Sequence, residues 1–406
     1  MHLDLSDRSK ALRSQLRDYF AEIITEDDRR DLVDQTEGGP TFSRILRRMG
    51  ADGWLGLGWP KEYGGRGEDP EALFVFYDEV IRANAPLSLV TLNTVAPALM
   101  KHGTDEQKRS FLPPILAGEL IFAIGYTEPG AGTDLAALST RATLDGDDLI
   151  INGNKIFTSA GIYADWIWLA VRTDPTAPPH RGISVVLVPT SAPGFSVTEI
   201  HTVGGISTSA TYYDNVRVPL ANVVGALNEG WPLITNQLNH ERVALAARGG
   251  IAYHLFDEVL AWAQHEPARD GVLYDQPWVQ STMAELYALL SATDLINLRL
   301  VADVANNTLN GGDSAAAKVF GTEAVVTAYN ALQEVLGGAG LLRAGSQRAV
   351  IDGRVETLGR RGQNNTFGGG TNEVMREIIA RHCLGMTMGA RRRTEHPSPA
   401  TGGTAT

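Results

Sequence analysis

The chain has 406 residues, of which 43% are hydrophobic and 20% charged, a composition typical of soluble globular proteins with two or three domains. Its net charge of −12 argues against nucleic acid as a partner, because no basic excess exists to neutralise phosphates. The single cysteine, Cys383, excludes an intrachain disulfide and a cysteine-based metal cluster. The sequence shows no secretory signal and no apolar run that spans a bilayer, so we expect a cytoplasmic protein without membrane insertion.

The first part of the chain is predicted to be helical. Apolar residues recur there at helical spacing, at Leu12, Leu16, Phe20 and Ile23. Ser6 precedes them as a candidate N-cap. Further helices are expected over residues 72–83, 87–100 and 107–116. We therefore assign residues 1–122 to an N-terminal helical domain.

The periodicity then changes to that of strands. Asp145-Gly146 is predicted to form a hairpin turn between two strands, and Asn152-Gly153 to form a second turn. Further strands are expected over residues 155–159, 166–171, 182–189 and 211–219. Residues 123–228 are accordingly predicted to form a middle β domain.

Long amphipathic helices return in the last third of the chain. They are predicted over residues 238–260, 279–304, 314–336 and 372–381. We assign residues 229–388 to a C-terminal helical bundle and residues 389–406 to a disordered tail. Helices, then strands, then helices predict an α+β chain rather than alternating βαβ units.

One stretch in the middle of the chain carries the most chemical information. It reads Tyr126-Thr127-Glu128-Pro129-Gly130-Ala131-Gly132-Thr133-Asp134 and follows the apolar run 120–124. A loop of this kind exposes backbone N–H groups and lets a planar or phosphorylated ligand approach closely. An ordinary surface turn is the alternative for a Gly-x-Gly segment on its own.

The complete string resembles the flavin-binding signature of acyl-CoA dehydrogenases, and the resemblance extends over residues 12–384 or so. It implies that FAD is the cofactor, with Tyr126 and Thr127 at the flavin pyrimidine and Gly132 and Thr133 near the pyrophosphate. Thr133 is also assigned to the substrate. The other residues that the resemblance assigns to the flavin are Phe157, which packs on the ring, Ser159 near its N5 atom, and Thr371 and Glu373 towards its ADP part.

The most informative departure from the family pattern concerns the residue that removes the substrate proton. Most of the family places a glutamate directly before Gly-Thr in a late loop, where this chain has Gly369. A minority carries the base on a bundle helix before an arginine, and Glu241 followed by Arg242 matches that pattern. The resemblance therefore implies Glu241 as the catalytic base and Arg242 as a substrate-binding residue. We also expect an ion pair between Glu128 and Arg242. A helix-start carboxylate stabilised by the macrodipole is the alternative for Glu241.

A second departure concerns assembly. Family members that form homotetramers carry an Arg-x-x-Phe-Gly motif that reaches a neighbour's flavin site, and residues 263–271 lack it. We therefore expect a heterotetramer with a second acyl-CoA dehydrogenase-like chain. The resemblance is closest to the actinobacterial subgroup that oxidises steroid side-chain acyl-CoA thioesters, with electrons passed to an electron-transfer flavoprotein. An acyl-CoA oxidase and a non-catalytic structural subunit remain the alternatives.

Overall fold

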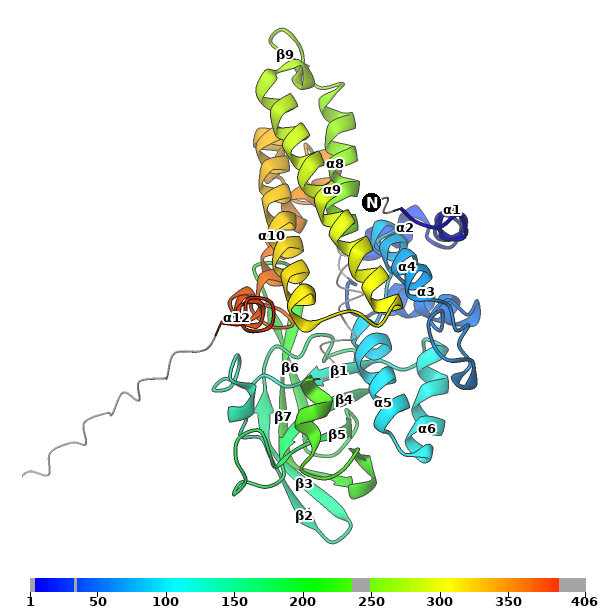
Figure 1. Cartoon of the computed structure of the whole chain (residues 1–406), viewed down its shortest axis with the longest axis vertical. Helices are drawn as coiled ribbons and strands as arrows, with labels where there is room; N and C mark the ends of the chain where they lie inside the picture. Colours follow the sequence, from blue (N-terminus) through cyan, green and yellow to red (C-terminus); the bar gives the residue numbers. More distant parts are fainter. Residues whose placement is uncertain (1–3, 33–34, 236–248, 387–406) are drawn as a thin grey trace, which may run out of the picture.

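The computed structural model describes residues 4–32, 35–235 and 249–386 of the chain. Figure 1 shows an elongated molecule in which long helices form one end, a β-sheet forms the other, and the N-terminal helices lie beside their junction. Helices and sheet are thus segregated along the chain, and the predicted α+β class is confirmed. No helix among the described residues is long and apolar enough to cross a membrane.

Capping residues mark the starts of several N-terminal helices. The N-terminal helices are α1 (Asp7–Ile23), α2 (Glu26–Leu32), α3 (Pro40–Ala51), α4 (Pro70–Arg82), α5 (Ala96–His102) and α6 (Asp105–Leu116). The predicted N-cap of α1 is confirmed, because the Ser6 hydroxyl accepts a hydrogen bond from the N–H of Ser9. A capping box formed by Thr104 and Gln107 starts α6. The helix expected over 87–100 contains one π-helical turn, Thr91–Val95, directly before α5.

Charged side chains join α1 to α4 in a partly buried network. Arg13 contacts Asp78 at 2.8 Å and Glu79 at 3.2 Å, and Arg82 contacts Asp78 at 3.0 Å. Asp294, on the bundle helix α9 (Pro277–Ala305) that packs on α4, lies near the same carboxylate. Burial raises the pKa of Asp294 to about 6, and the negative charge of Asp78 adds to this effect.

Asp294 is therefore expected to oppose folding at neutral and alkaline pH. Because its folded-state pKa is raised, stability falls as pH rises from the unfolded value of 3.8 through about 6. We expect Asp294→Asn to stabilise the protein by about 1–2 kcal/mol near pH 8 and by almost nothing near pH 3. Urea unfolding at the two pH values measures this, and an equal effect at both would contradict it.

Within the described residues the sheet has eight strands and a mixed topology. The strands are β1 (Phe122–Gly125), β2 (Arg141–Asp145), β3 (Asp148–Lys155), β4 (Trp166–Arg172), β5 (Ile183–Pro189), β6 (Phe195–His201), β7 (Ser207–Pro219) and β8 (Val223–Val224). Their order is β6-β7-β3-β2-β4-β5-β8, and β1 pairs in parallel with β4. The residues of β4 alternate between two cores: Trp168 packs with the N-terminal helices, and Leu169 packs with the remaining strands. A strand that is covered on both faces needs the continuous apolar run that β4 has.

Two sequence predictions in this domain were wrong. Asn152-Gly153 does not turn the chain, because β3 continues through it to Lys155. The irregularity lies in the facing strand, where Asn215 has a φ of 51° and its N–H donates to the Asn152 side chain at 3.0 Å. The β pattern also ends at Lys155 rather than Ser159. The Asn-Gly pair therefore lies at a β-bulge rather than in a hairpin turn.

The bundle consists of long antiparallel helices and shorter ones packed at their side. Besides α9 they are α8 (Gly249–Ala263), α10 (Gly311–Leu336), α11 (Arg354–Gly362) and α12 (Asn372–His382). A short ribbon, β9 (Pro267–Ala268) with β10 (Gly271–Val272), connects α8 to α9. The first part of the helix predicted over 238–260 lies outside the described residues.

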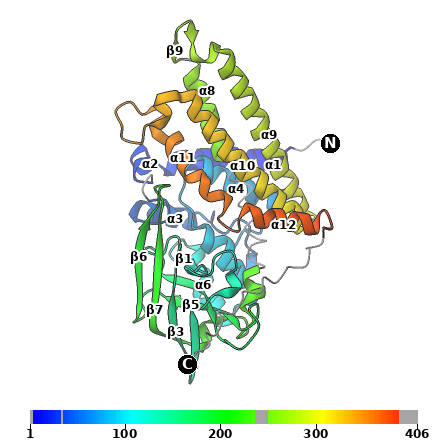
Figure 2. The ribbon, with the colours of Figure 1, turned by 90° about the vertical axis from the view of Figure 1, so that its left-hand side faces the viewer.

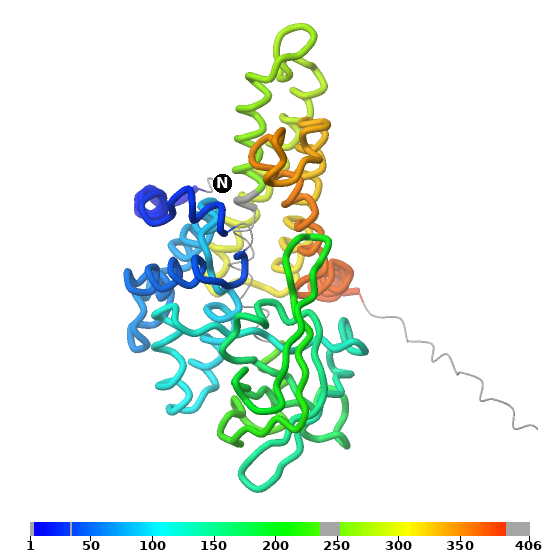
Figure 3. Tube along the Cα trace, turned by 180° about the vertical axis from the view of Figure 1, so that it is seen from behind, coloured from blue at the N-terminus to red at the C-terminus, as the bar shows by residue number. Residues whose placement is uncertain are grey.

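The hairpin of β6 and β7 bridges the sheet and the bundle. Figures 2 and 3 show its tip reaching the side of the bundle near the sheet. There the guanidinium groups of Arg360 and Arg361 on α11 donate to the carbonyl oxygens of Val203 and Gly204. Glu356 orients Arg360 through an ion pair of 2.6 Å. The two parts of the chain are therefore joined by hydrogen bonds to the hairpin backbone as well as by apolar packing.

Candidate functional site

The glycine loop, residues 126–134, begins where β1 ends. Gly125 is required there, because a Cβ would lie 2.8 Å from the Leu169 side chain. The hydroxyl of Tyr126 accepts a hydrogen bond of 2.9 Å from the Trp168 indole, which fixes its ring. Glu128 and Ala131 then exchange two backbone hydrogen bonds of 3.0 and 3.1 Å. These close a tight turn whose tip residues, Pro129 and Gly130, are exposed.

A buried ion pair anchors this turn to β3. The ammonium group of Lys155 contacts the Glu128 carboxylate at 2.8 Å, and the two side chains are 0% and 5% exposed. The same ammonium donates to the carbonyl oxygen of Tyr126 at 3.1 Å. Ser139 and Thr140 complete the carboxylate shell with backbone N–H bonds of 2.7 and 2.8 Å. Lys155 therefore holds both the start of the glycine loop and its turn.

The electrostatics of this pair favour the charged forms. Burial alone would raise the pKa of Glu128, but the Lys155 ammonium and the hydrogen bonds from Thr140 and Ser139 lower it to about 2. Burial lowers the pKa of Lys155 to about 8, against the attraction of Glu128. Lys155 thus remains a cation at neutral pH, and Glu128 remains its counter-ion. The sequence suggested Arg242 as the ion-pair partner of Glu128. Arg242 lies outside the described residues, and within them the partner of Glu128 is Lys155.

A second segment, residues 156–160, lies directly beside the glycine loop. The N–H of Ile156 donates to the carbonyl oxygen of Thr127 at 2.9 Å, so the two segments are in register. Phe157 and Ala160 both have a φ of 59°, in the left-handed region that non-glycine residues rarely adopt. Phe157 is also 60% exposed, although it is aromatic. Strain of this kind is retained where the surroundings, or a ligand, select the conformation.

The surface that these two segments present suits a flat ligand with an anionic part. A Cβ on Gly130 or Gly132 would meet nothing within 4 Å, so no side chain crowds this side of the loop. The N–H groups of Gly132 and Thr133 have no acceptor within the described residues. Free backbone donors in a glycine-rich loop are typical of phosphate contacts. The predicted residues here therefore fit the ring and pyrophosphate of a flavin dinucleotide.

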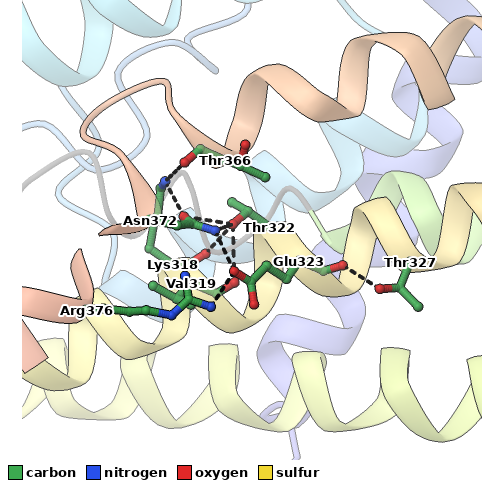
Figure 4. Close-up of polar contacts among 8 residues, drawn as sticks. All are labelled: Lys318, Val319, Thr322, Glu323, Thr327, Thr366, Asn372 and Arg376. Carbon is green, nitrogen blue, oxygen red and sulfur yellow. Dashed lines mark hydrogen bonds and ion pairs between the residues drawn. The ribbon is translucent and has the colours of Figure 1, made fainter. Parts of the chain in front are cut away.

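Thr371 and Glu373 lie in a different cluster. Thr371 caps α12 by accepting from the N–H of Val374 at 3.2 Å, and Glu373 is exposed in the first turn of this helix. The late loop, residues 366–371, leads into the cap. Figure 4 shows Asn372 and Arg376 of α12 meeting α10, with Lys318 close to the late loop. No hydrogen bond or ion pair among the described residues joins this cluster to the glycine loop.

Glu241 and Arg242 lie outside the described residues, as does His240. Gly369, at the position where most of the family has its base, has a φ of 68° and open space around it. The assignments of Glu241 as base and of Arg242 to the substrate therefore stay predictions.

A surface cavity of about 920 Å³ opens elsewhere, between α3, α6 and the short 3-10 helix Lys61–Tyr63. Its lining mixes charges of both signs, including Arg47 and Glu62, with Tyr63 and Leu116. It shares no residue with the predicted site.

Comparison with known families decides the identity of the chain. The acyl-CoA dehydrogenase N-terminal, middle and C-terminal domain models match residues 6–119, 123–216 and 228–384. The chain is a member of the acyl-CoA dehydrogenase family. It is therefore an oxidoreductase that acts on CH–CH bonds, and the family generally binds FAD.

Relatives within the acyl-CoA dehydrogenase family match almost the whole chain. Acyl-CoA dehydrogenase FadE26 of Mycobacterium tuberculosis is 49% identical, over 95% of this chain and 99% of the relative. FadE29 of the same organism is 46% identical, over 94% and 97%. Among solved structures, the Tcur3481-Tcur3483 steroid ACAD has a TM-score of 0.92 at 51% identity, covering 96% of this chain and 100% of that chain. The ChsE4-ChsE5 complex from M. tuberculosis has a TM-score of 0.90 at 49% identity, with coverage of 96% and 100%.

Sequence reasoning about this acyl-CoA dehydrogenase missed Lys155 and Lys318. A signal for Lys155 existed. On β3 the side chains of Leu149 and Ile151 are buried, and alternation places Lys155 on the same face. A lysine on an apolar face requires a buried counter-ion, and Glu128 was the acidic residue of the adjacent motif. Lys318 gave no such signal, because a lysine on a long helix is ordinarily solvated.

Proposed function

We propose that this chain catalyses FAD-dependent α,β-desaturation of an acyl-CoA thioester and passes electrons to an electron-transfer flavoprotein. One observation carries the proposal. In a chain of this family, hydrogen bonds hold residues 126–127 of the glycine loop beside residues 156–159, and the rest of the loop is open and has free N–H donors. Tyr126, Thr127, Phe157 and Ser159 would hold the flavin ring.

The chemistry divides between the cofactor and the protein. FAD, held by Tyr126, Thr127, Phe157 and Ser159, would supply the acceptor for the hydride that leaves the β-carbon of the substrate. The carboxylate of Glu241 takes the proton from the α-carbon, so the two C–H bonds are replaced by one C=C bond. Thr133 and Arg242 contact the substrate, and Thr371 and Glu373 contact the ADP part of the cofactor. Gly369 leaves the entrance to the thioester wide, which suits a branched or steroid-derived acyl group.

We further propose that the chain works in a heterotetramer with a second acyl-CoA dehydrogenase-like chain. Two observations support this: residues 263–271 lack the motif that completes a neighbour's flavin site, and a structure with high similarity is the ChsE4-ChsE5 complex. The same similarity, with the steroid ACAD, supports a steroid side-chain thioester as the substrate class.

Flavin content tests the proposed assembly. Purified alone, the chain is expected to retain little flavin, and co-expression with the second chain is expected to give one FAD per heterodimer, because each chain supplies part of the site. Absorbance of the oxidised flavin and native mass measure both quantities, with the second chain expressed alone as the control. A homotetramer of this chain alone with one FAD bound per chain would contradict the heteromer. The desaturase activity would then be assayed directly on that homotetramer.

A further inference from the structure

Lys318, in the first third of α10, contacts both ends of the late loop. Its ammonium group donates to the carbonyl oxygens of Thr366 at 3.2 Å and Gly370 at 2.9 Å, and to the side-chain oxygen of Asn372 at 2.7 Å. All three bonds are charge-assisted, because the donor is an ammonium group. Figure 4 shows the lysine reaching from the helix to Thr366 and Asn372. One cation therefore bridges the two sides of a glycine-rich segment.

The segment between these contacts has little else to define its shape. Residues 368–370 are glycines, and a Cβ on Gly369 would meet no atom within 4 Å. The φ angles of Gly369 and Gly370 are 68° and 100°. Glycine loses more conformational freedom on ordering than any other residue, so three in succession favour a disordered loop unless a contact fixes the backbone. Among the described residues, the Lys318 bonds supply that contact, together with the N–H bond of Gly368 to Asn364.

The direction of the tether determines what the loop presents. In a trans peptide the C=O and the following N–H point in opposite directions. Because the Gly370 carbonyl faces Lys318, the N–H of Thr371 faces away from it. The N–H groups of Gly369, Gly370 and Thr371 find no acceptor in the described part of the chain. Consecutive free N–H groups in a segment with positive φ can form a concave donor site.

We propose that Lys318 is a positioning residue, which draws the carbonyl groups of the late loop towards α10 and so presents these three N–H groups to the bound ligand. Its effect on the ligand is exerted through the loop. The identity of that ligand rests on the proposed function. The loop ends at Thr371 and precedes Glu373, and both residues are assigned to FAD. Asn372 has a second role, since its amide donates to Glu323 at 3.1 Å and so fixes the first turn of α12.

The test compares Lys318→Met with Arg376→Met in the assembled complex with the second chain. Arg376 contacts Glu323 at 2.6 Å across the same α10–α12 contact, but it does not touch the loop carbonyls. In Lys318→Met we expect amide hydrogen exchange at Phe367 and Gly368, whose N–H groups bond to the Asn364 carbonyl, to accelerate about tenfold in the FAD-free complex, and the FAD dissociation constant to rise by a similar factor. Arg376→Met is expected to change neither quantity, because the loop tether is intact.

Two results would overturn the positioning role. One is unchanged exchange at Phe367 and Gly368 in Lys318→Met. The other is an acceleration that extends along α10 and α12, which would mean a general loss of helix packing rather than release of the loop. If Lys318→Met does not assemble, Lys318→Arg replaces it, since a planar guanidinium keeps the charge but cannot reproduce three convergent bonds. A wild-type complex that binds no FAD would contradict the proposed function, and the exchange rates would still decide the tether.

Discussion

Glu241→Gln is expected to leave FAD bound to the assembled enzyme and to lower the turnover number by about 10³-fold. The amide has nearly the same shape as the carboxylate but cannot take a proton. Only the ionised carboxylate takes a proton, so the wild-type rate should rise with pH as this group ionises. Acyl-CoA-dependent loss of the oxidised-flavin absorbance measures the reductive half-reaction directly.

Glu229→Gln provides a matched control for this change. Glu229 is an exposed carboxylate that precedes the same segment of the chain, and its replacement should leave turnover unchanged. Full activity of Glu241→Gln would remove Glu241 from the mechanism. An inactive wild-type complex with bound FAD would instead support the alternative that the chain is a structural subunit.

Lys155→Met should destabilise the protein by about 3–5 kcal/mol and abolish FAD retention. The substitution leaves the Glu128 carboxylate, which is 5% exposed, without its counter-ion. It also removes the donor to the Tyr126 carbonyl, so the start of the glycine loop loses its attachment to β3. Urea unfolding of the chain measures the first effect, and flavin content of the complex measures the second.

A double variant separates charge burial from loop attachment. Lys155→Met with Glu128→Gln should recover most of the lost stability, because no unpaired charge remains buried, but it should not recover FAD binding. Lys101→Met, at an exposed lysine of α5, should change stability by less than about 0.5 kcal/mol. If Lys155→Met is as stable as this control, the ion pair does not hold the site together.

Much of the architecture could be predicted because its signals are local. The helix over 107–116 has its capping box, and the hairpin at Asp145-Gly146 has a turn dipeptide between alternating strands; both are present in the structure. The predicted class followed from the same periodicities. The assignment of the site residues depended on resemblance to the family, since a glycine-rich loop by itself fits an ordinary turn.

The errors arose where contacts between distant residues overrode local preference. Asn152-Gly153 was assigned to a turn because this dipeptide favours one, but pairing of β3 with β7 moved the irregularity to Asn215. Phe157 was placed in a strand, and the structure has it in a left-handed turn next to Thr127. A single sequence carries no signal for such long-range partners.

The hairpin of β6 and β7 has a consequence for how the chain folds during its synthesis. Its tip at Val203 and Gly204 is held by Arg360 and Arg361, which the ribosome adds more than 150 residues later. Until then the tip protrudes without its anchor, and Val203, which is 85% exposed even in the folded chain, is open to other nascent chains. Contacts of such sequence separation slow folding, so the final docking of sheet and bundle is expected only after the chain is released. A chaperone that shields this hairpin would then act on the period before α11 is made.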